Sequence, residues 1–387
     1  MTHYDFAVIG GGPAGSAAAR RLAQKGGVVA LFERRAMPRT KPCGGGLSVR
    51  AMAHLDFPIP PELVDSEIHG TRIGLGAIFG EARLERLIGV LVTRSKFDHF
   101  MLKKAEEAGA QVLWQEVKSL EVRPDGVVLQ TPEGEVTARC AILCEGTNRR
   151  LSLAVRPADT PRQRAFCLEA DVPVPQPDPF AALRDMIDVR FGYPGRGYGW
   201  VFHHGTYYSV GVGGVAADFK NPREVFDKFV AGLGLDMTGV RVWGHFIPAV
   251  GLMRPMCADR LLVAGDAAGC VDPFQGEGLS YAIRSGQLAA DTALAAAARN
   301  DFSRTSLAGY ERRCAEAFGR DLRIALFLSK LTHLWPSLFT WLLAADPEVL
   351  RRYLQVAATE LSYRFFLRRL ILKGPWRWLK SRLRLIL

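Results

Sequence analysis

A single cysteine stands in front of three glycines in the stretch RTKPCGGGLS, which runs from Arg39 to Ser48. A thiol at Cys43 can ligate a metal, form half of a disulfide, act as a nucleophile or proton donor, or simply fill a turn. The glycines after it let the main chain lie against a flat ligand with no Cβ in the way. The rest of the chain narrows these alternatives.

The other cysteines argue against a metal site and against a disulfide at Cys43. The chain has seven cysteines, an odd and scattered set without a CxxC pair. Its beginning, MTHYDFAVIGGG, lacks the basic and apolar regions of a signal peptide. Together these features indicate reduced thiols and a cytoplasmic protein. Two interpretations of Cys43 remain, a proton donor in a site or a small residue that fills a loop.

The N-terminal segment has the pattern of a dinucleotide-binding unit. An apolar strand at residues 6–9 precedes Gly10-x-Gly12-x-x-Gly15 and an alanine-rich helix, and a second strand ends just before Glu33. The glycines permit close approach to a pyrophosphate at the helix N-terminus, and Glu33 can accept hydrogen bonds from a ribose. The residues expected at this site are Gly10, Gly12, Pro13, Ala14, Gly15, Glu33 and Arg34.

A second glycine pattern, Gly211-x-Gly213-x-x-Ala216, does not predict a second unit of this kind. It follows a strand-like run, but Pro222 delays the next helix. We therefore predict a bent strand containing glycines.

Composition and local sequence patterns divide the chain into two interleaved domains and a helical C-terminal region. A length of 387 residues with 48% hydrophobic and 23% charged residues is typical of a folded protein with a large core. We predict an α/β (α+β) fold. A Rossmann-like domain comprises residues 1–52, 93–164 and 254–302, a mostly antiparallel β domain comprises residues 53–92 and 165–253, and residues 303–387 are helical.

Several motifs in order resemble those of FAD-dependent oxidoreductases with the aromatic-hydroxylase fold. These are the first glycine pattern, Glu33, Arg94-x-x-Phe97-Asp98 and Gly265-Asp266. Within that superfamily, Lys41-Pro-Cys-Gly-Gly-Gly46 and Tyr198-x-Trp200-x-Phe202 resemble the geranylgeranyl reductase family. The resemblance covers residues 4–286. It implies bound FAD, held also by Cys43, Gly44, Gly45, Arg94, Gly265, Asp266, Pro273, Gly276 and Gly278.

The same resemblance suggests where a substrate lies. On a strand, Tyr198, Trp200 and Phe202 point to one side, so with Tyr193 they can line an apolar pocket for an isoprenoid chain; an ordinary domain core is the alternative. Cys43, or else Tyr198, is the expected proton donor. His203 stands where the family motif usually has proline, and we expect it to face the other way.

The C-terminal region is basic and amphipathic. From residue 347 to residue 387 ten Lys and Arg residues stand against two Glu, which accounts for most of the net charge of +11. In the last segment Trp376, Leu379 and Leu383 share one helical face beside basic residues. This pattern predicts a helix at a membrane surface, on the cytoplasmic side; docking onto the protein body is the alternative. Charge confined to one element does not suggest nucleic-acid binding.

These features predict an FAD-dependent reductase that saturates carbon–carbon double bonds of a prenyl chain, with electrons from NAD(P)H or a reduced protein. The alternatives are a flavin monooxygenase or halogenase, of which the latter is expected to show a Trp-x-Trp motif with a matching lysine, and a flavin-bearing scaffold at a membrane without enzymatic activity. The sequence does not identify the prenyl substrate or the oligomeric state.

Overall fold

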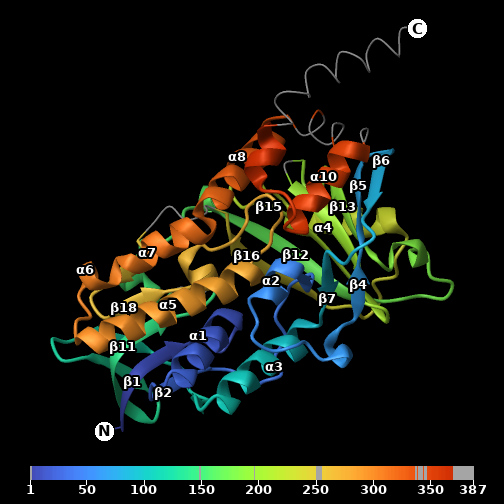
Figure 1. The fold of residues 1–387 in the computed structure, drawn as a ribbon. Coiled ribbons are helices and arrows are strands. Elements are labelled where there is room, and N and C mark those ends of the chain that lie inside the picture. The colour runs from blue at the N-terminus through green and yellow to red at the C-terminus, as the bar shows by residue number, and fades with distance from the viewer. Residues whose placement is uncertain are drawn as a thin grey trace.

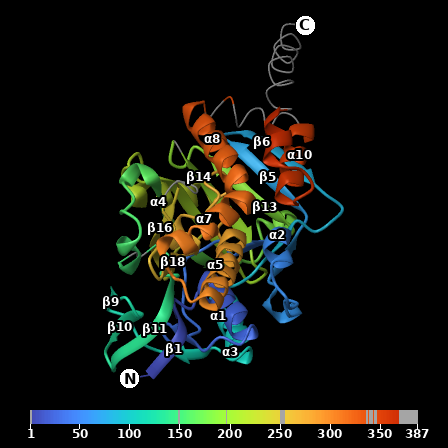
Figure 2. The same cartoon turned by 60° about the vertical axis from the view of Figure 1, so that its left-hand side comes forward.

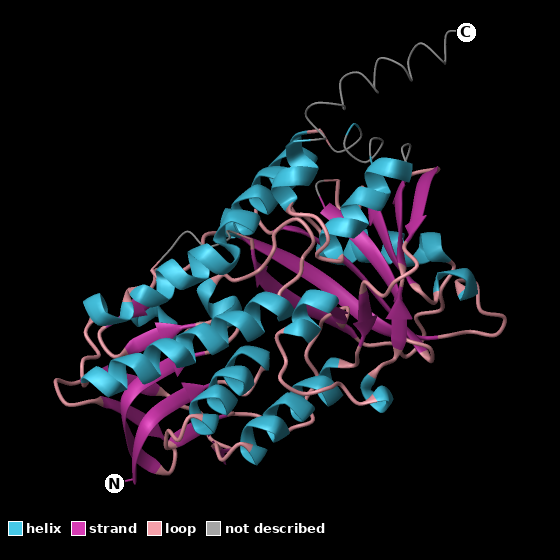
Figure 3. Ribbon diagram, viewed as in Figure 1, coloured by secondary structure: helices cyan, strands magenta, loops and turns pink. Residues whose placement is uncertain are grey.

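Two large sheets stand at opposite ends of the molecule, and long helices run between them (Figures 1 and 3). The computed structural model describes residues 2–147, 150–195, 197–249, 255–335, 338, 343 and 347–368. The architecture is the predicted mixture of α and β elements, and the layers of both sheets follow from the burial of their strands.

The first sheet contains the dinucleotide-binding unit. Its order is β17-β18-β11-β1-β2-β8, and β10 and β9 continue from β11 as an antiparallel extension. The strands are β1 (Thr2–Ile9), β2 (Val29–Phe32), β8 (Gln111–Leu113), β9 (Ser119–Val122), β10 (Val127–Thr131), β11 (Gly134–Leu143), β17 (Cys257–Ala258) and β18 (Leu261–Val263). Pairing of β1 with β2 and with β11 is parallel. Such strands need cover on both faces, and β2 is buried throughout.

Three helices accompany this sheet. They are α1 (Pro13–Gln24), α3 (Arg94–Glu107) and α5 (Leu279–Arg299), and α1 contacts both of the others. The crossover from β1 through α1 to β2 is the strand–helix–strand unit that the glycine pattern predicts. Its N-terminal helix end therefore lies at the carboxyl end of β1, where parallel sheets bind ligands.

The second sheet has seven strands in the order β16-β12-β15-β14-β13-β5-β6. The strands are β5 (Gly70–Leu75), β6 (Ile78–Arg83), β12 (Arg164–Pro173), β13 (Met186–Phe191), β14 (Gly197–His203), β15 (Tyr207–Val215) and β16 (Val242–Pro248). Every neighbouring pair is antiparallel except β5 with β13. The predicted bent strand with glycines is β15, so the second glycine pattern belongs to a sheet.

The two faces of the second sheet have different neighbours. One face, here called the outer face, packs Val201, Val210 and Val212 against Phe226 and Phe229 of α4 (Pro222–Leu233). The opposite, inner face carries Tyr198, Trp200 and Phe202 and borders a large cavity. Alternation of side chains along each strand assigns every residue to one face or the other.

A small sheet joins segments on both sides of the domain boundary predicted at residue 52. Its order is β3-β7-β4, with β3 (Gly46–Ser48), β7 (Gly89–Leu91) and β4 (Ser66–Ile68). After β3 comes the short helix α2 (Val49–Ala53). The chain leaves the Cys43 loop directly into β3, so this sheet anchors one end of that loop.

The C-terminal helices pack in two places, the first of them on α5 and the core of the first sheet and the last of them on the second sheet (Figure 2). They are α6 (Arg304–Leu307), α7 (Gly309–Cys314), a π-helical turn (Ala315–Gly319), α8 (Arg320–Leu334) and α10 (Pro347–Ala357). Ile73 of β5 shares a core with Leu328 of α8 and Leu350 of α10. Within the described part of the chain, each helix is too short or too polar to cross a bilayer. The predicted amphipathic segment after Pro375 lies outside the described residues.

Candidate functional site

One cavity of about 1450 Å³ lies between the two large sheets. Pockets for a single small ligand typically enclose about 300–1,000 Å³, so this one has room for more than one molecule. It is lined by the carboxyl ends of β1 and β2, the Cys43 loop, the inner face of the second sheet and parts of α5 and α10.

At one end of the cavity, main-chain atoms at the beginning of α1 form a concave surface, here called the cradle. Gly10, Gly12 and Ala14 line it at the beginning of α1, whose N-terminus has no side-chain cap. A Cβ on Gly15 would collide with the carbonyl oxygen of Gly10, so glycine is required for the close packing of α1 on the turn. The helix therefore presents free N–H groups and its positive dipole end to the cavity.

Glu33 stands beside this cradle at the end of β2. Its carboxylate accepts hydrogen bonds from the N–H groups of Gly11 (3.0 Å) and Arg35 (3.0 Å) and is 5% exposed. A carboxylate has about four acceptor positions, so capacity remains for a ribose diol. Arg34 also lines the cavity, as predicted from its position after Glu33.

The beginning of α5 faces the cavity from a second side. Gly276 and Gly278 line it just before the helix begins at Leu279, and Asp266 lines it in a short 3₁₀ turn after β18. The Ser285 hydroxyl accepts a hydrogen bond from the Gly265 N–H (2.9 Å) and fixes this turn. The site thus combines two helix N-termini with two carboxylates.

The Cys43 loop is fastened on both sides. Its Cys43 N–H donates to the Glu169 carboxyl, and the Gly44 carbonyl lies 3.2 Å from Nε2 of His204. Gly45 has φ +71°, a conformation that favours glycine, and a Cβ there would also meet the Val92 carbonyl. The loop therefore needs its glycines to reach this position against the second sheet.

A buried guanidinium lies beside the thiol of Cys43. Arg94 makes two hydrogen bonds to Asp98 (2.8 and 3.0 Å), and its charge interacts with Cys43. Burial lowers the pKa of Arg94, but the charges of Asp98 and Cys43 raise it further, so the net shift is upward. A charged guanidinium stabilises any thiolate formed at Cys43. Arg94 is only 8% exposed, so it belongs to the interior and not to the surface.

A second group of titratable side chains lies on the other side of the loop. Burial raises the pKa of Glu169 to about 8, although the Cys43 N–H opposes the shift. Lys41 Nζ lies 2.6 Å from Nε2 of His245, and burial lowers the pKa of Lys41. Burial, and then the charges of Lys41 and Arg94, lower the pKa of His245 to about 3. Neutral His245 therefore accepts a hydrogen bond from Lys41.

Three aromatic side chains form a wall on the inner face. The ring centroids of Tyr198 and Trp200 are 6.2 Å apart, and those of Trp200 and Phe202 are 6.5 Å apart. The indole of Trp200 lies over Gly211, where a Cβ would collide with it. Burial raises the pKa of Tyr198, whose hydroxyl lies near Gly276. The predicted common direction of these three side chains is confirmed.

Beyond the aromatic wall the cavity becomes apolar. Ile73 of β5, together with Ile187 and Val189 of β13, lines it from the sheet, and Leu354 and Ala357 line it from α10. No charged side chain of the described residues in β5 or β13 lines this lobe. We call this region the apolar lobe.

Two family models match parts of the chain. Residues 4–62 match the pyridine nucleotide-disulphide oxidoreductase family, and residues 231–322 match the FAD-binding domain family. The first match covers the glycine cradle and Glu33, and the second covers Asp266 and the beginning of α5.

Curated relatives match over most of their length. The geranylgeranyl diphosphate reductase of Rhodobacter capsulatus is 33% identical over 76% of this chain and 75% of its own. Digeranylgeranylglycerophospholipid reductase 1 of Methanopyrus kandleri is 31% identical over 81% of this chain and 87% of its own. The chain belongs to the geranylgeranyl reductase family. As a member of that family the protein is an FAD-dependent oxidoreductase, which confirms the predicted family, enzyme class and cofactor.

Solved structures agree with the fold of this geranylgeranyl reductase family member. A geranylgeranyl bacteriochlorophyll reductase-like protein of Thermoplasma acidophilum superposes with a TM-score of 0.82 at 23% identity, over 97% of both chains. The flavin-dependent brominase Bmp2 superposes with a TM-score of 0.71 at 19% identity, over 97% of this chain and 100% of its own. At such identities the likeness concerns the fold. The Trp-x-Trp sequence expected of a halogenase does occur, as Trp376-Arg-Trp378, but outside the described residues.

The residues present in this family member fit FAD. The uncapped end of α1 suits a pyrophosphate, Glu33 suits a ribose, and the glycines before α5 leave space for a flat ring near the Cys43 loop. Asp266 lies 3.4 Å from a Cβ built on Gly278, which places its carboxylate beside the beginning of α5.

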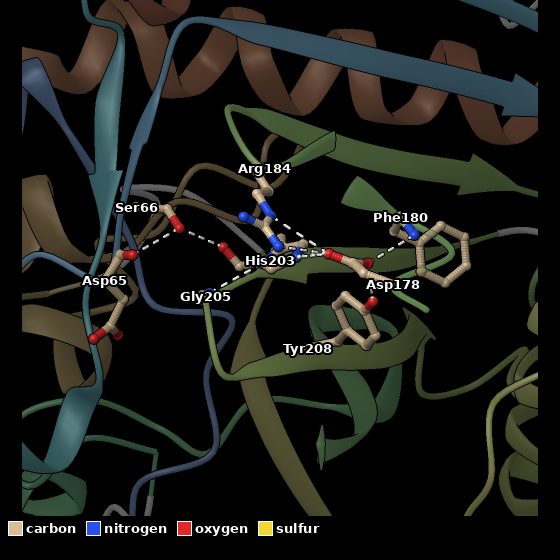
Figure 4. Close-up of polar contacts among 8 residues, drawn as sticks. All are labelled: Asp65, Ser66, Asp178, Phe180, Arg184, His203, Gly205 and Tyr208. Atoms are coloured by element: carbon tan, nitrogen blue, oxygen red, sulfur yellow. Dashed lines mark hydrogen bonds and ion pairs between the residues drawn. The ribbon is translucent and has the colours of Figure 1, made fainter. Parts of the chain in front are cut away.

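His203, the residue that departs from the family motif, belongs to a buried network on the outer face (Figure 4). Its Nε2 donates to Asp178 (3.0 Å), and its Nδ1 accepts from the Gly205 N–H (3.0 Å). Tyr208 also donates to Asp178. Because the Ser66 hydroxyl donates to the His203 carbonyl (2.6 Å), the network ties β14 to β4. His203 faces away from the cavity, as predicted, and its contacts are those of a structural residue.

Three predicted site residues do not line the cavity of this reductase family member. The ring of Tyr193 packs on Phe229 of α4 at 5.0 Å, because the turn before β14 carries it to the outer face. Gly15 lies in the packing of α1 behind the cradle, and Pro273 lies in the turn before Gly276. The other predicted site residues all line the cavity.

Sequence reasoning missed several residues that line the same cavity. Glu169, His245, Trp243, Tyr353 and Leu354 come from segments far from Cys43 in the chain. The alternation along β12 and β16 signals that Glu169 and His245 share a face, but the pairing of these strands does not follow from the sequence.

Proposed function

We propose that this protein is an FAD-dependent reductase that saturates carbon–carbon double bonds of a prenyl chain. The observation that carries the proposal is the continuity of the apolar lobe with the flavin cradle, with the Cys43 loop between them. A lobe lined by Ile, Val and Leu side chains suits a hydrocarbon chain without polar groups. The names of the curated relatives support a prenyl substrate.

The reaction needs a hydride for one alkene carbon and a proton for the other. Bound FAD supplies the hydride chemistry when reduced. In our proposal Cys43 donates the proton from its thiol, and Arg94 stabilises the thiolate that remains. Asp98 keeps Arg94 oriented through two hydrogen bonds. An isolated alkene has no carbonyl to hold negative charge, so a positioned acid is essential to this step.

Two side chains of the protein hold the Cys43 loop in place. Glu169 and His204 fasten the main chain at Cys43 and Gly44 from opposite directions. Tyr198, buried beside Gly276, is the second candidate for proton donation, although burial raises its pKa and weakens it as an acid. Of these two candidates, Cys43 is better placed than Tyr198, because it lies beside the charged Arg94.

Narrowing the apolar lobe tests this function. Ala357 of α10 lines the lobe, so Ala357→Phe is expected to raise the KM for geranylgeranyl diphosphate in an assay driven by dithionite. The flavin spectrum and the rate of flavin reduction should stay unchanged. An unchanged KM in a variant with a normal flavin spectrum would contradict a prenyl chain in the lobe.

We also propose that the C-terminal side contacts a membrane surface. On α8 and just after it, Phe327 (50% exposed), Leu334 (67%) and Leu338 (42%) recur at spacings of seven and four residues, and Trp335 is 57% exposed. Exposed apolar residues at such spacing with a nearby tryptophan are typical of an interfacial helix. The four basic residues after Pro375 add roughly 1 kcal/mol each at an anionic surface.

Liposome flotation tests the membrane contact. Deletion of residues 375–387 is expected to weaken flotation with anionic vesicles while flavin content is kept. Phe327→Ser with Leu334→Ser should weaken flotation with neutral vesicles as well. Equal flotation of all three proteins would show that these segments do not contact lipid.

A further inference from the structure

The buried side chain of His204 faces a hydrogen-bond acceptor at each of its ring nitrogens. His204 follows β14 directly and is 4% exposed. Its Nε2 lies 3.2 Å from the Gly44 carbonyl oxygen, and its Nδ1 lies 2.9 Å from a carboxylate oxygen of Asp65. A carbonyl and an ionised carboxylate accept hydrogen bonds and donate none, so the ring makes both bonds only when both nitrogens carry a proton.

The contacts of Asp65 favour an ionised carboxylate. An unperturbed carboxyl has a pKa of about 3.9 and an unperturbed imidazole has one of about 6.5, so in a pair of the two the proton resides on the imidazole. The same oxygen of Asp65 also accepts a hydrogen bond from the Thr93 hydroxyl (2.8 Å). Burial raises the pKa of Tyr207, so its hydroxyl stays protonated and donates to Thr93 (2.9 Å). Asp65 is therefore the acceptor at which both chains of hydrogen bonds end.

The neighbouring histidine has the opposite arrangement. His203 accepts a hydrogen bond at Nδ1 from the Gly205 N–H and donates one from Nε2 to Asp178 (Figure 4). One neutral tautomer satisfies both of these contacts. His204 in addition stacks on the Tyr207 ring, with the centroids 4.5 Å apart and the planes 10° apart, which suits a cation over an aromatic face. Two adjacent histidines, each beside an aspartate, thus differ in charge.

The carboxylate of Asp65 connects the two segments that carry the thiol and the guanidinium. Through His204 it holds the main-chain carbonyl of the residue directly after Cys43. Through Thr93 it holds the residue directly before Arg94. Neither His204 nor Asp65 lines the cavity, so each acts on the site through the residues that it holds.

We propose that His204 is a positioning residue of this site, an imidazolium that bridges Asp65 and the Gly44 carbonyl and so sets the place of the Cys43 thiol beside Arg94. A hydrogen bond from a charged donor is roughly twice as strong as a neutral one, so the charge of the ring is what fixes the loop. The consequence for catalysis rests on the proposed function, in which Cys43 donates the proton. The bridge itself does not rest on it.

Nitrogen-15 NMR of the oxidised, FAD-loaded protein labelled at histidine tests the charge of the bridge at about pH 7. The ring of His204 is expected to show two protonated nitrogens, and the ring of His203 one protonated and one bare nitrogen. The variants H204Q, H204N and H203Q assign the signals to the two rings. A bare ring nitrogen on His204 in the parent protein would overturn the proposal.

Hydrogen exchange followed by mass spectrometry tests whether the bridge holds the loop. In H204Q the amides of residues 43–46 are expected to exchange about tenfold faster than in the parent protein, the value of one charge-assisted hydrogen bond. H203Q is the matched control, because it makes the same substitution at the adjacent residue on the outer face, and it should leave exchange in this loop unchanged. Parent-like exchange in H204Q, or an equal increase in both variants, would overturn the proposal.

Anaerobic single turnovers connect the bridge to the chemistry. In H204Q, reoxidation of the reduced flavin by geranylgeranyl diphosphate should slow by about tenfold or more, while reduction of the flavin by dithionite stays at the parent rate. Reoxidation at the parent rate would overturn the positioning role of His204. A parent protein that leaves the prenyl chain intact, but has a doubly protonated His204 and a loop that H204Q loosens, would refute the proposed function and leave the bridge standing.

Discussion

The two halves of the inner face share one backbone geometry and differ in chemistry. On β5 and β13 the cavity-facing positions hold Ile73, Ile187 and Val189, whereas on β12 and β16 they hold Glu169 and His245. Both halves rest on the same sheet and follow the same two-residue alternation. The difference teaches that one sheet can present an apolar surface and a polar surface to the same cavity.

The Cys43 loop lies at the boundary between these two halves of the inner face. A Cβ on Gly44 would meet the Phe202 ring at 2.6 Å, which places this glycine against the aromatic wall. The neighbouring N–H of Cys43 reaches Glu169 on the polar side. The Cys43 loop therefore contacts both the aromatic wall and the polar half of the cavity.

The largest effect is expected from Cys43→Ala, which removes the thiol that we propose as the proton donor. Reoxidation of the reduced flavin by geranylgeranyl diphosphate should slow by about 10²- to 10⁴-fold, while reduction of the flavin by its donor stays near the parent rate. Cys43→Ser should fall between the two, because a hydroxyl keeps the hydrogen bond but is a poorer acid. Anaerobic stopped-flow spectroscopy separates the two half-reactions.

Cys167→Ala is the matched control for this experiment, since Cys167 also faces the cavity but lies on β12, away from Arg94. It should reoxidise at close to the parent rate. A parent-like rate in Cys43→Ala would leave the thiol without a chemical role and would make Tyr198 the next donor to substitute.

A smaller effect, on stability alone, is expected when the outer face is changed. Asp178→Asn removes the carboxylate that accepts from both Tyr208 and His203, which costs about 1–3 kcal/mol in the free energy of unfolding. Chemical denaturation measures this loss. Flavin reoxidation should not change, and a large change in it would show that the outer face shapes the site.

A separate effect concerns the pH dependence that Glu169 gives to stability. Its pKa of about 8 lies above the value of 4.5 for an unperturbed carboxyl, so the folded state keeps a proton that the unfolded chain releases. This contribution is complete below about pH 4.5 and is lost as the pH rises through about 8.

The free energy of unfolding should therefore fall between pH 5 and pH 8 by up to about 1.4 kcal/mol per pH unit from this group. Glu169→Gln should remove this part of the slope. Denaturation at several pH values compares the two proteins. Identical slopes for the parent and Glu169→Gln would mean that Glu169 is ionised throughout.

Local patterns in the sequence predicted the parts of the site that are local in the chain. The glycines from Gly10 to Gly15 predicted the turn and helix of the cradle, because close packing at the turn tolerates no Cβ there. Alternation from Tyr198 to Phe202 predicted the aromatic wall, since strand geometry fixes which side chains share a face.

Contacts between distant segments were not predictable in the same way. The amphipathic pattern of α10 shows an apolar face, but not that Leu354 and Ala357 close the apolar lobe. Glu169 and Cys43 are 126 residues apart, and their contact depends on strand pairing and loop path. Tyr193 was misplaced because the turn before β14 interrupts the alternation on which its assignment to the pocket relied.

The most direct test of the central claim is an anaerobic single turnover. Protein loaded with FAD and reduced by dithionite is mixed with geranylgeranyl diphosphate, and the product is analysed by mass spectrometry while the flavin spectrum is followed. The account predicts that two hydrogen atoms enter the prenyl chain for each flavin reoxidised, without oxygen. A prenyl chain of unchanged mass, with a flavin that reoxidises only when oxygen is admitted, would contradict it and would favour an oxygen-dependent flavoenzyme.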